Sequence, residues 1–218
     1  MSFGLSRGKV LDIGSVGLTQ DEMPSGEPGQ FDPQSWFETQ LSPLEIEIGS
    51  GKGTFLLQEA TQRKQVNFLG IEWSAEFFRY AADRLRRHYL ANVKIMHDDA
   101  TEFICYWCKD SIADAIHLYF SDPWPKKRHH KRRVIQDTTL KHFYRILKPG
   151  GTVHVVTDHD ELWEWNLSHF KRHANLFGMK SFAPAISAST DELVGTNFER
   201  KYKNEGRLIK SVTLEKIS

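Results

Sequence analysis

The sequence predicts an α/β protein with a doubly wound, mostly parallel sheet that helices cover on both faces. Two observations support this prediction: apolar runs alternate with amphipathic helical stretches, and the connections between them are short. The length of 218 residues is enough for one sizeable domain with a proper core. Residues 19–35 are polar and proline-rich, so we expect residues 1–40 to form a partly flexible N-terminal tail and residues 41–218 a single domain.

The predicted strands and helices follow one another in order along the chain. Parallel strands are expected at 44–49, 66–73, 92–97, 114–120 and 152–157. Helices are expected around 53–64, after Ser74 as N-cap, between the third and fourth strands, over 132–147 and over 159–177. "KPGG" (148–151) stops the fourth of these helices. Residues 207–216 alternate apolar and polar side chains, which predicts an antiparallel edge strand.

Composition narrows the class of protein. The net charge is only +1, which excludes a generic polyanion binder, and no apolar run approaches the roughly 18 residues that a membrane span needs. There is no secretory apolar segment at the N-terminus, so we expect a reducing, cytoplasmic setting and no membrane partner. Cys105 and Cys108 have redox or half-zinc-site spacing, but no second CxxC exists, and we interpret them as buried structural thiols.

A glycine-rich loop, "EIEIGSGKGTFLL" (45–57), joins the first predicted strand to its helix. Gly49, Gly51 and Gly53 permit a tight turn and a close approach of the backbone to a ligand. Thr54 breaks the dinucleotide pattern GxGxxG, and Gly53 after Lys52 breaks the P-loop pattern. The remaining fit is GxGxG, a loop that passes under the amino-acid part of S-adenosylmethionine, and a purely structural turn stays open.

Carboxylates stand at the ends of four predicted strands. They are Glu72, Asp99, Asp122 and Asp158. Ligands of doubly wound folds bind at the carboxyl ends of strands, so these acids are candidates for one site. Glu72 lies about 20 residues beyond the glycine loop, the separation expected for a carboxylate that binds ribose hydroxyls. Asp99 is expected near an adenine edge, whereas Asp158 is compatible with a simple N-cap.

The stretch "DPWPKKRHHKRR" (122–133) combines an isolated acid with a dense run of cations. Residues 126–133, the basic strip, carry +6 from Lys and Arg, so the rest of the chain sums to about −5. Such a run indicates local contact with a polyanion. If all six cations contact phosphates of a single strand, the logarithm of the binding constant should fall with the logarithm of salt concentration with a slope of about −4. A solvated helix start or a nuclear-localisation-like patch is the alternative.

Seven motifs, "EIGSGKG", "GIEWS", "HDDA", "FSDPWPKKRHHKRR", "LKPGG", "TDH" and "TNFERK", fall in an order that resembles the tRNA (guanine-N7-)-methyltransferases over roughly residues 44–210. The resemblance implies a class I, Rossmann-like fold with a seven-stranded sheet. It implies that Asp122 is catalytic and that S-adenosylmethionine contacts Glu47, Gly49, Gly51, Gly53, Glu72, Trp73, Asp99, Ala100 and Asp122. It further implies that substrate contacts Lys126, Asp158, Thr196, Asn197, Phe198 and Glu199, and that RNA contacts Arg128, His129, His130, Lys131, Arg132 and Arg133.

The implied reaction is methylation of N7 of a tRNA guanine, at position 46 of the variable loop. N7 is a lone-pair acceptor that needs no deprotonation, so positioning and a fixed negative charge suit the reaction better than a strong base. The alternatives are a methyltransferase for an exocyclic amino group of a nucleobase and a non-catalytic RNA-binding protein. "HFKRH" (169–173) lacks a third ligand, so no metal is expected. A partner subunit is neither required nor excluded.

Overall fold

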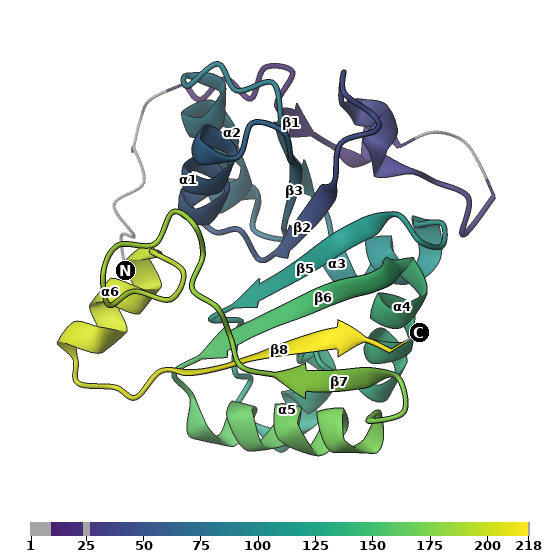
Figure 1. Ribbon diagram of the computed structural model, residues 1–218. Helices are drawn as coiled ribbons and strands as arrows, with labels where there is room; N and C mark the ends of the chain where they lie inside the picture. Colours follow the sequence, from purple (N-terminus) through teal and green to yellow (C-terminus); the bar gives the residue numbers. More distant parts are fainter. Residues whose placement is uncertain (1–9, 24–26, 218) are drawn as a thin grey trace.

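The computed structural model describes residues 10–23 and 27–217, which form a sheet between two layers of helices (Figure 1). The sheet has eight strands in the order β1-β4-β3-β2-β5-β6-β8-β7. The strands are β1 Gly17–Leu18, β2 Leu44–Ile48, β3 Asn67–Glu72, β4 Val93–His97, β5 Ala113–Tyr119, β6 Leu147–Thr157, β7 Phe177–Lys180 and β8 Lys210–Lys216. The α-helices are α1 Thr54–Gln62, α2 Ala75–Arg86, α3 Ala100–Glu102, α4 Asp137–Ile146, α5 Asp160–Arg172 and α6 Asn197–Asn204.

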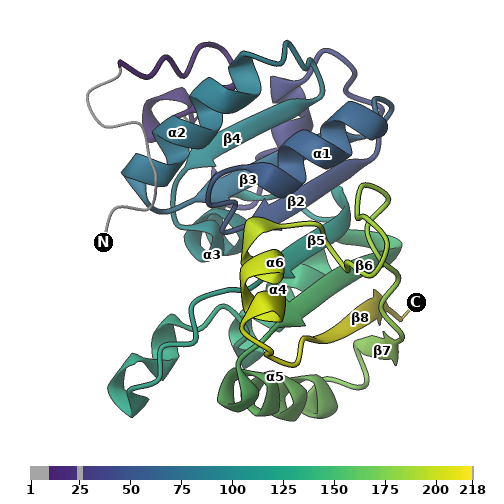
Figure 2. The same ribbon diagram turned by 90° about the vertical axis from the view of Figure 1, so that its left-hand side faces the viewer.

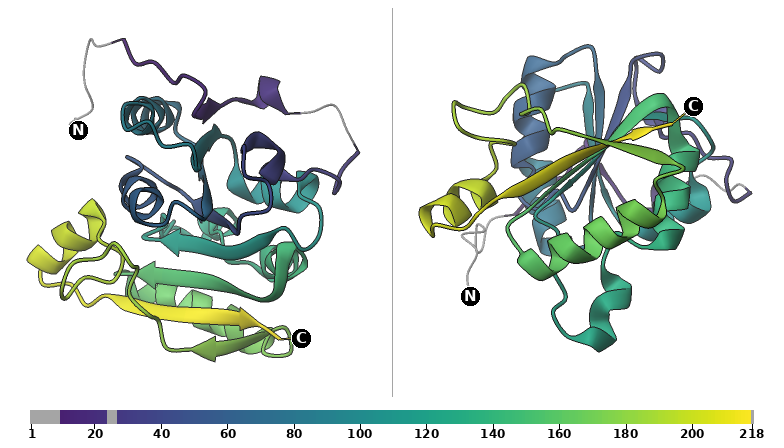
Figure 3. Two further views of the ribbon diagram at one scale, coloured as in Figure 1. Left: turned by 45° about the horizontal axis from the view of Figure 1, so that its top comes forward. Right: turned by 60° about the horizontal axis from the view of Figure 1, so that its bottom comes forward.

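The predicted doubly wound, mostly parallel arrangement is confirmed. Strands β1 to β6 run parallel, and the chain order reverses between β2 and β5. Helices α1 and α2 cover one face of the sheet, and α3, α4 and α5 cover the other (Figure 3). Strands β2 and β3 are buried along their whole length. The sequence of β3 accordingly has a continuous apolar run, whereas β2 alternates with Glu45 and Glu47, which are themselves buried.

Local sequence signals fix several element ends. The hydroxyl of Ser74 accepts a hydrogen bond from the amide of Phe77 and caps α2, as the sequence predicts. The basic strip forms a 3₁₀ turn, Lys127–Arg132, and α4 begins only at Asp137, later than the predicted start at 132. The hydroxyl of Thr139 accepts from the amide of Gln136 at that start, so the helix begins where its N-terminal amides find partners.

The far edge of the sheet differs from the prediction. Strand β8, expected as an edge strand, lies between β6 and β7 and runs antiparallel to both. The edge strand is β7, which has only four residues, includes Gly178 and has no apolar-polar alternation, so the sequence carries no strand signal there. Strand β1 is likewise too short, at two residues, to be seen as a strand. The sheet therefore has eight strands where the sequence predicts seven.

The described part of residues 1–40 contacts the domain. Strand β1 pairs with β4, and the Trp36 ring stacks on Phe103 with centroids 6.0 Å apart. Phe31 lies beside Trp36 at 4.7 Å, and Phe37 is buried. The domain boundary at residue 40 stays a prediction, and residues 1–9, 24–26 and 218 lie outside the described ranges. No helix in the described ranges is both long and apolar enough to cross a membrane.

Candidate active site

A pocket of about 220 Å³ opens where β2 and β5 end, at the point where the strand order reverses. Its walls come from the glycine loop, from Tyr119 at the end of β5 and Phe120 after it, from Phe77 of α2 and from the start of α6. Ligands of doubly wound folds bind at this position of the sheet. Figure 2 views the molecule from this end of β5 and β6, with α6 in front of the sheet.

The glycine loop leaves its backbone bare toward this pocket. Gly49, Gly51 and Gly53 have φ values of +78°, +52° and +65°, a region that side chains other than glycine rarely adopt. A Cβ on Gly49 would meet nothing within 4 Å, and one on Gly51 would meet only Phe198, at 3.9 Å. These two glycines are therefore required by backbone conformation and not by protein packing, and the space above them is open to a ligand.

Glu72 holds the glycine loop in place. One carboxylate oxygen accepts a hydrogen bond from the amide of Gly51 at 2.7 Å, and the other accepts from the amide of Ser74 at 2.8 Å. Burial raises the pKa of Glu72 although these bonds oppose the shift, and the charge of Asp122 raises it further. Each oxygen keeps accepting capacity for a ligand hydroxyl.

Glu47 is a buried carboxyl group in the wall of the pocket. Its Oε2 has no hydrogen-bond partner among the described residues. Burial raises its pKa to about 8, and the charge of Glu72 contributes to the shift. Ser50 opposes the shift without cancelling it, so the carboxyl group is mostly protonated at neutral pH, and the pocket favours a ligand that brings positive charge or hydrogen-bond donors.

The acid predicted to be catalytic, Asp122, stands on a strained turn beside the pocket. Phe120 and Trp124 on either side have φ values of +51° and +43°, which cost about 1–3 kcal/mol each in residues other than glycine. Asp122 is exposed, and Phe120 is the pocket-wall residue nearest to it in sequence. Its charge acts on Glu72 and also on Tyr202 of α6, so it lies near both the glycine loop and that helix.

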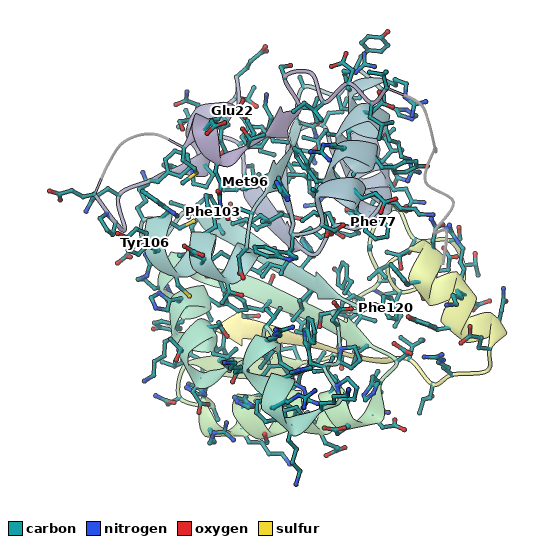
Figure 4. The ribbon with its side chains drawn as sticks, turned by 180° about the vertical axis from the view of Figure 1, so that it is seen from behind. Glu22, Phe77, Met96, Phe103, Tyr106 and Phe120 are labelled. Carbon is teal, nitrogen blue, oxygen red and sulfur yellow. The ribbon has the colours of Figure 1, made fainter. Side chains whose placement is uncertain are left out.

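The segment 196–199 lies against the glycine loop, and its assignment to substrate binding stays a prediction. The side-chain amide of Asn197 donates to the hydroxyl of Thr54 at 3.4 Å, and Phe198 lines the pocket. Thr196 is buried and caps α6 by accepting from the amide of Glu199. Figure 4 shows Phe77 and Phe120, which also line the pocket, on the side of the molecule that carries α6.

The carboxylate of Glu199 makes its hydrogen bonds and its ion pair within residues 193–203. It is fully buried and accepts hydrogen bonds from the amides of Leu193, Val194 and Gly195. It also pairs with the ammonium group of Lys203 at 3.0 Å. The sequence places Glu199 among the substrate-binding residues, whereas in the structure it anchors the loop before α6.

Asp158, at the end of β6, is likewise engaged. Its Oδ2 accepts from Nη1 of Arg207 at 2.6 Å, and the same guanidinium lies 4.4 Å from the centre of the Tyr202 ring. Burial raises the pKa of Tyr202, and the charges of Asp158 and Asp122 add to the shift. Asp158 therefore connects β6 to the segment that carries α6.

The basic strip projects beyond the ends of the strands as a separate lobe, drawn in teal below α3 in Figure 2. Its exposed cations are Lys126, Lys127, Arg128, Lys131 and Arg132. Arg132 lies 4.8 Å from the ring centre of Trp124, and His129 packs edge-on against the same ring. His130 is half-buried against Trp165. Arg133 is 2% exposed, so it cannot contact RNA as the sequence predicts unless the turn opens.

Of the nine residues predicted to bind the cofactor, only Glu47, Gly49 and Gly51 line the pocket itself; the other six are Gly53, Glu72, Trp73, Asp99, Ala100 and Asp122. Asp99 caps α3 by accepting from the amides of Thr101 and Glu102, and Ala100 is buried behind it. Trp73 is 72% exposed next to Glu72, and its carbonyl accepts from His97. Their assignment stays a prediction. Among the described residues, no group of three or more His, Cys, Asp or Glu side chains is arranged to hold a metal ion.

The sequence interpretation missed the aromatic residues of the site. Phe77, Tyr119 and Phe120 line the pocket, and Tyr202 lies 5.7 Å from Phe120 and 6.0 Å from Phe198. The only available signal was "YF" directly before Ser121 and Asp122. Tyr202 lies in the polar stretch "ERKYKNE" (199–205), where nothing in the sequence indicates that its ring is part of the site.

A family profile and individual related sequences both identify this chain as a member of a methyltransferase family. Residues 42–212 match the profile of a protein family described as "Putative methyltransferase". Proteins of Streptococcus pneumoniae strains CGSP14 and TIGR4, named "tRNA (guanine-N(7)-)-methyltransferase", are 35% identical over 177 residues, which is 80% of this chain and 82% of theirs.

Solved structures show the fold. The aminoglycoside resistance methyltransferase NpmB1 superimposes with a TM-score of 0.58 at 14% identity, over 88% of this chain and 99% of its own. A SAM-dependent methyltransferase from Aquifex aeolicus gives a TM-score of 0.52 at 14% identity, over 81% of this chain and 83% of its own. Both likenesses indicate the same class I sheet topology.

Proposed function

The chain belongs to the family of the tRNA (guanine-N7-)-methyltransferases, and from this premise we propose that it transfers a methyl group from S-adenosylmethionine to N7 of a guanine in tRNA. The observation that supports this most directly is the position of Asp122, whose charge acts on Glu72 of the glycine-loop pocket while the basic strip begins four residues later. One carboxylate is thus near the glycine loop and, in sequence, next to the cations that we propose to bind phosphate. We propose the variable-loop guanine, position 46, as the target.

The pocket residues fit the methyl donor. S-adenosylmethionine supplies an electrophilic methyl group on a cationic sulfur, and it also carries an ammonium group and two ribose hydroxyls. Glu47 is the buried acid that such a cationic ligand would ionise, because its Oε2 has no other partner among the described residues. Glu72 is placed to accept from ribose hydroxyls while it holds the loop through Gly51. The bare backbone at Gly49 and Gly51 leaves room for the donor.

Asp122 supplies the fixed negative charge that this reaction needs. Guanine N7 has a lone pair in the major-groove edge, and methylation leaves the base cationic, so no base has to remove a proton first. A carboxylate held near the developing charge stabilises the transition state more than the ground state. The strained turn at Phe120 and Trp124 fixes the direction of Asp122 before substrate arrives. Asp122 also suits acceptance of hydrogen bonds from the Watson–Crick edge of guanine.

The aromatic side chains beside Asp122 provide a surface for the target base. The Tyr202 ring packs against Phe120 and Phe198, which both line the pocket, and Phe198 is 43% exposed. Stacking of a base on an aromatic ring contributes about 1–3 kcal/mol. We propose that the guanine leaves its stack and lies against this surface while the exposed cations of the basic strip hold the flanking phosphates. The expected setting is the cytoplasm.

The test is incubation with bulk tRNA and a methyl-labelled donor, followed by digestion and identification of the labelled nucleoside. The expected product is N7-methylguanosine, which alone yields strand scission after reduction and aniline treatment. Label in an N-methylated exocyclic amine would overturn the proposal in favour of an amino methyltransferase. No heat of donor binding in calorimetry, together with retained tRNA binding, would leave a non-catalytic RNA-binding protein.

A further inference from the structure

Arg133, the last residue of the basic strip, faces inward. It is 2% exposed, whereas the five other Lys and Arg residues of the strip are exposed. Its guanidinium lies 4.9 Å from the ring centre of Trp165 in α5 and pairs with the carboxylate of Glu161 at 2.8 Å. A cation stacked on indole and paired with an acid is screened from phosphate. Arg133 therefore has a different role from the five exposed Lys and Arg residues of the basic strip.

The guanidinium reaches the turn that carries Asp122. Its Nε donates to the carbonyl of Pro123 at 2.9 Å, and Nη2 lies 3.4 Å from the carbonyl of Trp124. These are the two residues directly after Asp122, and Trp124 has the left-handed φ of +43°. Residues 121–125 lie in no helix or strand, so the turn depends on such side-chain contacts to keep its shape.

Only arginine provides this set of contacts at once. The guanidinium is planar and offers five N–H donors in a fixed fork, so it can bond two carbonyls and one carboxylate while its face stays on the indole. Lysine would keep the positive charge, but its ammonium group is a compact point charge without a planar face. The charge on Arg133 is balanced locally by Glu161, and the hydrogen bond from Arg133 is the first cause of the lowered pKa of Glu161.

We propose that Arg133 is a positioning residue that orients the Asp122 turn from α5. The guanidinium ties the carbonyls after Asp122 to Glu161 and Trp165, both on the first two turns of α5. It thereby fixes the direction of the Asp122 carboxylate relative to the pocket and joins the basic strip to the body of the domain. The catalytic consequence of this inference rests on the proposed function, whereas its structural content does not.

The test separates shape from charge by comparing Arg133→Lys with Arg133→Gln. In steady-state kinetics with tRNA, we expect both variants to lower kcat roughly 10- to 100-fold. The KM for tRNA should stay within about threefold of the wild-type value, and the salt dependence of tRNA binding should stay close to that of wild type. Lys131→Gln is the matched control on the exposed face and is expected to raise KM and flatten the salt slope while kcat stays unchanged. If Arg133→Lys is fully active and only Arg133→Gln binds tRNA weakly, Arg133 contacts phosphate and the proposal is wrong.

A second measurement does not depend on activity. In hydrogen exchange of the free protein, we expect Arg133→Lys to speed exchange in peptides covering 120–134 and to leave peptides covering 44–57 unchanged. Glu161→Gln, at a side chain that is 53% exposed and so compatible with folding, is expected to change exchange and kcat in the same direction by a smaller factor. Unaltered exchange at 120–134 in both variants would overturn the inference. Altered exchange in a protein that methylates no guanine would instead overturn the proposed function alone.

Discussion

Three carboxylates, Glu47, Glu72 and Asp122, surround the site in three different electrostatic settings. Glu47 is buried with an unpartnered oxygen, Glu72 is bonded to two backbone amides, and Asp122 is exposed on a strained turn. Burial raises the pKa of Glu47 and favours its neutral form, whereas the two amide bonds tie Glu72 to the glycine loop and to the start of α2. Asp122 is therefore the one of these three carboxylates that is open to solvent and to a large substrate.

The first prediction at the scale of residues concerns the charge of the Asp122 side chain, separated from its size. Asp122→Asn keeps the size of the side chain and removes its charge, so we expect kcat to fall about 10²–10³-fold because transition-state stabilisation is lost. The Kd for tRNA is expected to stay within about threefold, because the exposed strip and not Asp122 holds phosphate. Filter binding and single-turnover kinetics measure the two quantities. Asp21→Asn, at an exposed acid of the 3₁₀ turn Gln20–Glu22, is the control; a parallel loss of affinity and activity in Asp122→Asn would contradict the role.

A second residue-scale prediction concerns the aromatic mouth. Tyr202→Leu removes the ring that packs on Phe120 and Phe198 but keeps an apolar side chain. Loss of one stacking contact of about 1–3 kcal/mol predicts that kcat/KM for tRNA falls roughly 5- to 150-fold while the Kd of the methyl donor is unchanged. Steady-state kinetics and calorimetry check this. Tyr106→Leu, half exposed next to Trp107, serves as the control; equal effects in both variants would point to a general loss of stability.

At the scale of elements, the sequence predicts what periodicity and strand ends reveal. The strands of the parallel sheet and the helices between them were predictable, because buried strands are apolar runs and amphipathic helices have their own period. The glycine loop and the acids at the ends of β3 and β5 followed from the same logic. Strand β7 was not predictable, since four residues with Gly178 give no pattern and pairing with β8 decides the conformation.

Side-chain orientation was the other limit of prediction. A run of six Lys and Arg residues looks uniform in sequence, but the partners that bury Arg133, Glu161 and Trp165, come from α5, 28 and 32 positions away. Similarly, nothing in "TNFERK" shows that Glu199 bonds the preceding backbone while Phe198 faces the pocket. Local sequence predicts which chemistry is present in a segment, whereas tertiary packing decides which of its members face the ligand.

The exposed cations of the basic strip permit a prediction at this scale. With Arg133 buried, five exposed Lys and Arg residues remain, which lowers the largest expected salt slope for tRNA binding to about −3.5 at about −0.7 per contact. Lys126→Ala and Arg132→Ala are each expected to weaken binding and to flatten the slope by about 0.7. Titrations at several salt concentrations measure the slope, with Lys141→Ala of α4 as the control. A slope that does not change in either variant would exclude the phosphate contacts.

At the scale of the whole molecule, the fold gathers ligand-binding features at one end. The net charge of +1 conceals this arrangement, because the +6 of the basic strip is balanced by acids elsewhere in the chain. The glycine loop, the Asp122 turn and α6 come from three distant parts of the sequence and meet where the strand order reverses. Binding of any ligand here is therefore linked to the stability of the entire domain.

That linkage gives a prediction for stability against pH. The pKa of Glu47 is about 8 in the folded protein and about 4.5 in the unfolded chain, so the folded state binds the extra proton between these values. The contribution of Glu47 to the free energy of unfolding of the ligand-free protein is therefore expected to fall as pH rises from about 4.5 to about 8. In Glu47→Gln this contribution is absent, so the variant should be more stable than wild type by a few kcal/mol at pH 8 and equally stable at pH 4.5. Urea unfolding across this range measures the difference, and curves that run parallel would show that Glu47 does not titrate in the window.

The same group predicts a proton linkage when the methyl donor binds. Below pH 8 the free protein holds Glu47 protonated, and a cationic ligand beside this carboxyl group favours its charged form. Binding at pH 7 should therefore release close to one proton, and the apparent affinity for S-adenosylmethionine should rise with pH up to about 8. Calorimetry in two buffers with different ionisation enthalpies counts the proton, and Glu47→Gln should bind more weakly with none released. The same heat in both buffers for the wild type would mean that the donor's charge lies elsewhere in the pocket, and would remove Glu47 from the donor site.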